Sequence, residues 1–129
     1  MMYLHLLDQF PMTSTTAIAD ALLAIQERIG EIICNYETAS LMETRLAVRF
    51  QINNCKALLD QVLEINASDR LSQSVCQQYV GILNNNLQIL TNLENNCISN
   101  QNRIEIANKL DMLAKINNAI VQLGKEDNV

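Results

Sequence analysis

The fold of this chain is decided between residues 18 and 36, whose sequence is IADALLAIQERIGEIICNY. Apolar side chains recur there in alternating steps of four and three residues, at Ile18, Leu22, Ile25, Ile29, Ile32 and Tyr36. This spacing is nearly three heptads, and it aligns the side chains along one face of an α-helix. The next positions in phase are Ala39 and Glu43, so the pattern stops. We therefore expect a first helix that follows the run Thr13–Thr16 and ends between Asn35 and Thr38.

A second helix is predicted to begin directly after this break. Ser40-Leu41-Met42-Glu43 has the spacing of a capping box, in which the Ser oxygen accepts from the Glu N–H and the carboxylate accepts from the Ser N–H. The apolar face of this helix consists of Leu41, Val48, Ile52, Cys55, Leu59 and Val62, widened by Leu58 and Ile65. Residues 66–69, Asn-Ala-Ser-Asp, are expected to end the second helix and to cap a third.

The third helix carries apolar residues on four heptad phases, an arc of about 140°. These residues are Val75, Cys76, Tyr79, Val80, Ile82, Leu83, Leu87, Ile89, Leu90 and Leu93. So wide an arc predicts that this helix is the most buried of the set. The run Asn84-Asn85-Asn86 is its weak point, since Asn is a mediocre helix former. The apolar spacing passes through that run without a slip, which favours one helix over a break into two.

A fourth helix is predicted from a cap formed by Asn102 and Glu105 to an end at Gly124, with its apolar face at Ile106, Leu110, Leu113, Asn117 and Ile120. Only one Pro and three Gly occur in the 129 residues, too few for the turns of an all-β fold. The prediction is an all-α, antiparallel four-helix bundle with coiled-coil-like packing. Residues 1–12 form an apolar arm, 13–124 one domain and 125–129 a frayed tail. The alternative is that two chains share one core.

Charge and composition exclude several classes of partner. With a net charge of −5 and a pI near 4.7, the chain has no general attraction for nucleic acid. The stretch Leu71–Leu93 lacks charge over 23 residues, but 11 of these are Ser, Thr, Asn or Gln, so no membrane span is expected. The N-terminal apolar run has no basic residue before it, and Asp8 ends it early. We therefore expect a cytoplasmic protein with reduced thiols.

The four cysteines, Cys34, Cys55, Cys76 and Cys97, are each 21 residues apart. In an antiparallel bundle Cys34 and Cys97 lie near one end and the other two farther along, so the four cannot share one zinc ion, which holds its sulfur ligands at about 2.3 Å. Pairing of Cys34 with Cys97, or of Cys55 with Cys76, stays possible. Because 21 residues are three heptads, the spacing is also that of ordinary buried thiols on helical faces, the interpretation that we prefer.

Catalytic constellations are missing from the sequence. The only imidazole, His5, lies in the arm, so a Cys-His pair or a His-containing metal centre in the bundle has no His to use. Phosphate-binding Gly-rich loops and the Gly-x-Ser-x-Gly nucleophile motif are absent as well. The sequence predicts no enzyme, no cofactor and no metal site.

Amides are the unusual feature, since 16 Asn and 10 Gln outnumber the 9 basic and 14 acidic residues. Asn86 and Asn117 fall on apolar seams, where a polar residue often fixes helix register. The remaining amides either reflect composition alone or mark a docking face, because interface centres are depleted of charge. An uncharged third helix indicates that little of it faces water, either inside the monomer or against a partner.

These patterns predict a protein–protein interaction module, in the manner of an adaptor, an inhibitor or a secretion-type chaperone, which binds a partner's amphipathic helix. The candidate contact residues are Gln73, Gln77, Asn84, Gln88 and Asn92 on the third helix, with Leu4, Leu7 and Phe10 of the arm. The alternative function is a self-assembling coiled-coil subunit, a homodimer or larger oligomer, driven by the heptads of the first helix.

Overall fold

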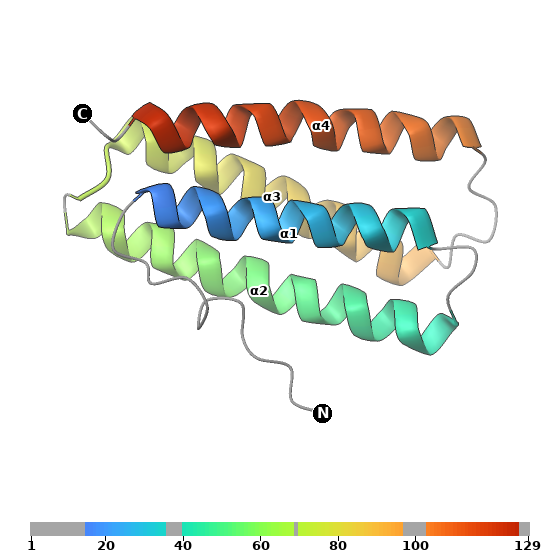
Figure 1. Ribbon diagram of the computed structural model, residues 1–129. Helices are drawn as coiled ribbons and strands as arrows, with labels where there is room; N and C mark the ends of the chain where they lie inside the picture. The colour runs from blue at the N-terminus through green and yellow to red at the C-terminus, as the bar shows by residue number, and fades with distance from the viewer. Residues whose placement is uncertain (1–14, 36–39, 69, 97–102, 127–129) are drawn as a thin grey trace.

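The computed structural model describes residues 15–35, 40–68, 70–96 and 103–126. They form four α-helices: α1 (Thr15–Asn35), α2 (Leu41–Ala67), α3 (Gln73–Asn96) and α4 (Arg103–Glu126). Figure 1 shows the helices side by side with alternating directions, and this part of the chain contains no strand. The predicted antiparallel four-helix bundle is therefore confirmed, and α3 is one continuous helix through its three consecutive asparagines.

Side-chain caps set both ends of α2, as the sequence predicted. Ser40 lies in extended backbone and accepts a hydrogen bond from the Glu43 N–H through its Oγ, at 3.1 Å. At the other end the Ser68 N–H donates to the carbonyl of Glu64 at 3.2 Å, and the Ser68 Oγ donates to the carbonyl of Ile65 at 2.9 Å. These bonds satisfy backbone groups that have no partner within the helix.

The cap of α3 differs from the prediction. Ser72, rather than residues 66–69, caps this helix, because its Oγ accepts from the Val75 N–H at 3.2 Å and its carbonyl accepts from the Cys76 N–H at 2.9 Å. Asn66 instead ties the connection together, since its Nδ2 donates to the carbonyl of Leu71 at 3.1 Å. The predicted turn is real, and the helix starts later than its Ser and Asp residues indicated.

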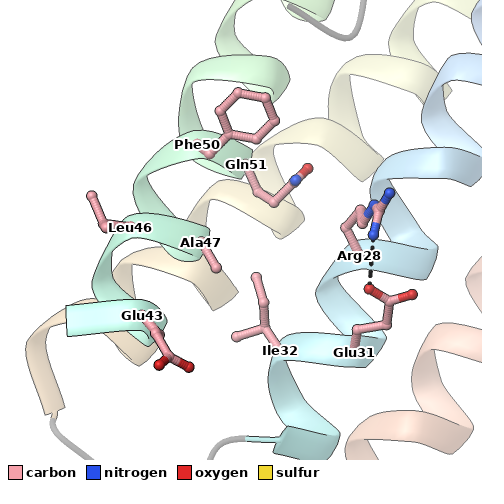
Figure 2. A pocket seen from close by; sticks show the side chains of 8 residues that line it. All are labelled: Arg28, Glu31, Ile32, Glu43, Leu46, Ala47, Phe50 and Gln51. Atoms are coloured by element: carbon pink, nitrogen blue, oxygen red, sulfur yellow. Dashed lines mark hydrogen bonds and ion pairs between the residues drawn. The ribbon is translucent and has the colours of Figure 1, made fainter. Parts of the chain in front are cut away.

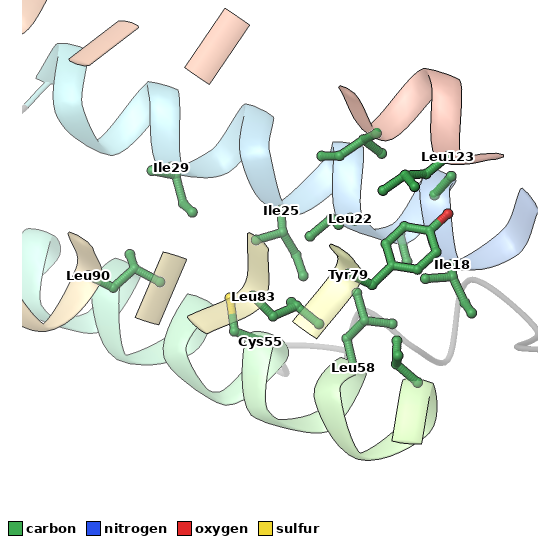
Figure 3. Close-up of a cluster of buried hydrophobic side chains, with 14 of the residues drawn as sticks. Ile18, Leu22, Ile25, Ile29, Cys55, Leu58, Tyr79, Leu83, Leu90 and Leu123 are labelled. Atoms are coloured by element: carbon green, nitrogen blue, oxygen red, sulfur yellow. The ribbon is translucent and has the colours of Figure 1, made fainter. Parts of the chain in front are cut away.

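The core lies between the four helices (Figure 3). α1 packs closely on α4 and α2 packs closely on α3, while α1 contacts α2 less extensively. Each fully buried Leu or Ile side chain contributes about 1.5–3 kcal/mol relative to exposure. The largest fully buried apolar side chains are Ile18, Leu22, Ile25, Ile29 and Ile33 of α1, Leu58 of α2, Tyr79, Leu83 and Leu90 of α3, and Ile120 of α4.

The most buried helix is α1 and not, as predicted, α3. The physical reason is the packing order: α2 and α4 cover α1 from two sides, whereas α3 is covered by α2 but meets α4 only over a short stretch. Ile82 and Ile89, on one heptad phase of the wide apolar arc of α3, therefore stay half-buried. The heptad face of α1, by contrast, is used inside the chain.

Gly124 does not end the fourth helix, which continues to Glu126. A Cβ atom at this position would lie 2.9 Å from the Cβ of Ala19 on α1, closer than two such atoms can approach. The glycine is therefore explained by the close contact between α1 and α4, and the prediction that it terminates the helix is wrong.

Candidate functional site

The five candidate contact residues of the third helix share one face of α3. Gln73, Gln77, Asn84, Gln88 and Asn92 are all exposed, on the side of the helix away from the buried row. Burial among the described helices therefore does not explain why this helix lacks charge. The explanations from composition alone and from contact with a partner both stay open.

The remaining candidate contact residues belong to the N-terminal arm. Leu4, Leu7 and Phe10 lie outside the described residues. The same holds for Cys97, so a pairing of Cys34 with Cys97 is untested.

A groove runs beside the uncharged face of α3, where α3 and α4 separate. This α3/α4 groove has a volume of about 310 Å³ and carries no charged lining residue. Its walls are Gln78, Gly81, Ile82 and Asn85 of α3 and Ile116, Ala119 and Leu123 of α4. The groove exists because α3 and α4 form the least extensive of the four contacts between neighbouring helices in the described bundle.

The wall formed by α4 continues the apolar character of the groove along the helix. Met112, Ile116, Ala119 and Leu123 follow one another at steps of four, three and four residues, which places them on one side of α4. Met112 is 50% exposed although it is a large apolar side chain. The apolar stripe of α4 is thus longer than the part that α3 covers.

Gly81 lies in the middle of α3 at the edge of this groove and is exposed. A Cβ atom built there would meet nothing within 4 Å. A glycine inside a helix costs about 0.5–1 kcal/mol relative to alanine, and no contact in the described part of the chain requires this one. Its place on an uncharged groove wall, with Ala119 on the wall formed by α4, suits the close approach of another backbone.

A second groove lies between α1 and α2 (Figure 2). This α1/α2 groove has a volume of about 470 Å³ and is lined by Arg28, Glu31 and Ile32 of α1 and by Glu43, Leu46, Ala47, Phe50 and Gln51 of α2. It shares no residue and no helix with the α3/α4 groove. Sequence reasoning missed it, because Ile32 and Ala47 fit the pattern of core residues.

The centre of the bundle contains a polar layer, which we define as Gln26, Cys55, Asn86 and Asn117, one residue from each helix. The Asn86 Nδ2 donates a hydrogen bond to the Gln26 Oε1, and both residues are fully buried. Burial raises the pKa of the Cys55 thiol to about 12, and a hydrogen bond with Asn86 opposes part of that rise. So high a pKa keeps Cys55 protonated and unreactive at neutral pH.

Asn117 lies level with Gln26 across the α1–α4 contact. Ala19 faces Gly124, and Asn117 precedes Gly124 by as many residues as Gln26 follows Ala19. The Gln26 Nε2 and the Asn117 Oδ1, a donor and an acceptor, are buried without a hydrogen-bond partner, as is the Asn86 Oδ1. The sequence indicated both asparagines but missed Gln26, although its position four residues after Leu22 and three before Ile29 is that of a core residue.

The described cysteines are three free thiols. Cys55 and Cys76 are buried, Cys34 is exposed, and all three are free, so the possible Cys55–Cys76 pairing is not formed. Across the same ranges no three His, Cys, Asp or Glu side chains lie close enough together to hold a metal ion.

None of the four helices, over the residues described, is long and apolar enough to cross a membrane. No protein-family model matches this chain, and neither does any curated protein or solved structure. The functional argument therefore depends on the grooves themselves.

Proposed function

We propose that this protein is a non-enzymatic interaction module that binds an amphipathic helix of a partner protein in the α3/α4 groove. The observation that carries the proposal is Gly81, an exposed glycine in mid-helix on an uncharged groove wall, with open space where its side chain would be. By analogy of fold and size alone, the module would act as an adaptor, an inhibitor or a secretion-type chaperone.

The groove has the composition expected of a helix-binding site. An amphipathic helix docks by placing apolar side chains, three and four residues apart, into an apolar groove. Ile82 supplies that surface on α3 and Ile116 supplies it on α4, while Leu123 lines the groove but is nearly fully buried. Because Gly81 has no side chain and that of Ala119 is small, the backbone of the partner helix can come close to α3 and α4. The exposed amides of α3 then form an uncharged, hydrogen-bonding rim.

Self-assembly is the alternative function, and the fold changes the argument for it. The heptads of α1 that motivated it are occupied in the core, where Ile25 is fully buried. The variant Ile25→Asp would therefore unfold the monomer and would not separate the two functions. If a second copy of this chain fills the α3/α4 groove, light scattering will show a mass that rises with protein concentration and that Gly81→Leu lowers.

Site-specific photo-crosslinking in native host cells tests the proposal. A benzoylphenylalanine at Gln78, which is exposed and lines the groove, is expected to crosslink to one segment of another protein with apolar residues at helical spacing. The same group at Glu64, exposed on α2, serves as the control and should not reach that segment. Crosslinks from Gln78 that involve only this chain, or that match those of the Glu64 control, would contradict the proposal.

Matched variants then measure what the groove contributes to affinity for the crosslinked segment. Gly81→Leu fills the groove and is expected to abolish binding, while Gln77→Glu with Gln88→Glu adds charge at the rim and lowers affinity about tenfold. Gln122→Glu with Asn118→Asp adds the same charge to the exposed side of α4 and should change affinity little. Undiminished binding by Gly81→Leu would place the partner elsewhere.

A further inference from the structure

The α1/α2 groove is a hollow of about 470 Å³ that the proposed function leaves unused. Figure 2 shows Ile32 and Ala47 directed into the space between the helices, with the Phe50 ring farther along α2. Met42 and Leu46, one turn apart on the same helix, are 72% and 55% exposed. Large apolar side chains so exposed next to an apolar hollow mark a surface that another molecule covers.

Carboxylates stand on both walls at one end of the groove. Glu31 of α1 and Glu43 of α2 lie on either side of Ile32 (Figure 2). A contiguous hollow of about 200 Å³ is lined by these two carboxylates and by Ile32, Asn35, Thr44 and Ala47, without a cationic side chain. This end of the groove therefore favours a positive charge on whatever binds it.

The cations of the two helices offset only part of the negative charge at this end. Arg28 lies 3.1 Å from Glu31 and occupies one carboxylate oxygen from the opposite direction along α1. Arg49 is paired at 2.6 Å with Glu94 of α3. No described side chain forms an ion pair with Glu43, and Arg45 lines neither hollow.

We propose that the α1/α2 groove is a second binding site, for a segment of a partner protein that carries an apolar side chain and, one helical turn away, a Lys or Arg. The apolar side chain contacts Ile32, Ala47 and Phe50, and the cation lies beside Glu31 and Glu43. Since this groove and the α3/α4 groove use different helices, both are accessible at once, as an adaptor requires. This inference does not depend on the proposed function.

The chain's own N-terminal arm does not fit this chemistry. Residues 1–12 include several apolar side chains but no Lys or Arg, and their one basic side chain, His5, is mostly neutral at pH 7. An arm seated in the groove would leave the Glu31 and Glu43 end without its cation. A partner segment that supplies both groups is the better match.

Designed peptides test the site. The probe is a labelled, Ala-based helical peptide with two Leu one turn apart and a Lys one turn beyond them; its two controls replace Lys with Glu or both Leu with Gln. Fluorescence anisotropy is expected to show that the Lys peptide binds about tenfold more tightly than the Glu peptide, and that the Gln peptide does not bind. Amide chemical shifts should change around Ile32 and Ala47 and not around Ile82.

Protein variants test whether Glu31 and Glu43 cause the preference for Lys and whether the peptide binds in the α1/α2 groove. Glu31→Gln with Glu43→Gln should bring the Lys and Glu peptides to within about twofold of each other, whereas Glu27→Gln with Glu64→Gln, elsewhere on the same helices, should preserve the tenfold difference. Ala47→Phe should fill the groove and prevent binding, with circular dichroism confirming the fold. Gly81→Leu should leave peptide binding here unchanged, which separates this site from the α3/α4 groove.

Either of two results overturns the inference. The first is equal affinity of the unaltered protein for the Lys and Glu peptides, including no affinity for either. The second is a Lys peptide that does not bind the full chain and binds once residues 1–12 are deleted, since the arm would then occupy the groove.

Discussion

The α1–α4 contact and the α3/α4 groove use the same helix in opposite ways. On the side facing α1, Gly124 lets the backbones meet so closely that a Cβ would lie 2.9 Å from Ala19. On the side facing α3, Gly81 of α3 has open space above it, and apolar residues of α4 stay partly uncovered. A contact with Ala19 explains Gly124, whereas no contact among the described residues explains Gly81. The difference is the reason why we propose the α3/α4 groove as the binding site of a partner helix.

The largest loss of stability is expected from a larger side chain at Gly124 in the α1–α4 contact. Gly124→Leu should lower the free energy of unfolding by about 3 kcal/mol, because overpacking of a tight contact forces backbone shifts. Gly124→Ala should lower it by less, since the better helix propensity of alanine offsets part of the clash. Urea denaturation followed by circular dichroism measures both.

A double-mutant cycle checks that the contact itself is responsible. Ala19→Gly with Gly124→Ala moves the methyl group from one helix to the other, so the two changes should be strongly non-additive, with the pair more stable than the sum of the single variants predicts. Additive effects would show that the two residues do not meet.

The next largest loss of stability is expected from changes in the polar layer at the centre of the bundle. Asn86→Ala should lower the free energy of unfolding by about 2 kcal/mol, because it leaves the buried Gln26 amide without its hydrogen bond and opens a cavity. Replacing both residues, as Asn86→Leu with Gln26→Leu, should be close to neutral, since neither buried amide then loses its partner and only the weak hydrogen bond of the Cys55 thiol is lost. If the double variant were as unstable as the single one, shape rather than hydrogen bonding would explain the layer.

The titration of Cys55 tests whether water from the α3/α4 groove reaches the polar layer. Its pKa is raised from 9.0 to about 12, so its contribution to stability is complete below pH 9 and is lost as the pH rises toward 12. Over that range the unfolded chain has released the thiol proton and the folded chain has not. The free energy of unfolding should therefore fall by about 1.4 kcal/mol per pH unit more steeply than in Cys55→Ala. Equal slopes in urea titrations would mean that Cys55 is hydrated in the folded state.

The smallest expected effect is a gain in stability, and it tests directly whether the space beside Gly81 is open. Gly81→Ala should raise the free energy of unfolding by about 0.5–1 kcal/mol, because alanine is the better helix former and its methyl group meets no atom. Thermal unfolding of the isolated protein measures the gain. A loss of stability would show that something inside the chain already occupies the space above Gly81.

Much of the local structure followed from residue pattern alone. Ser40 and Glu43 gave the start of α2, and the apolar spacing through residues 83–90 predicted one helix across three asparagines. These features depend on contacts within a few residues, which a sequence displays directly. The start of α3 was misplaced because Ser68 and Ser72 both have capping chemistry, and only the path of the connection selects between them.

The candidate site was harder to predict for a related reason. Gln73 and Gln77 were singled out because they lack charge, and the structure places them on the exposed back of α3, beside the groove rather than in it. The α1/α2 groove was missed altogether. A hollow between two helices depends on how far apart their axes lie, which the pattern of one helix does not contain.

The sequence by itself determined four helices, most of their ends and the direction of each apolar face, because helix propensity, capping and heptad spacing act over short distances. Only the tertiary structure decided which faces meet. Gly81 and Gly124 look alike in the sequence, each within a helical segment, and they acquire different roles because α4 packs closely on α1 and only briefly on α3. The packing of the helices decides which apolar residues are buried against a neighbouring helix and which stay exposed. We propose that this protein binds its partners at the apolar residues that stay exposed in the two grooves.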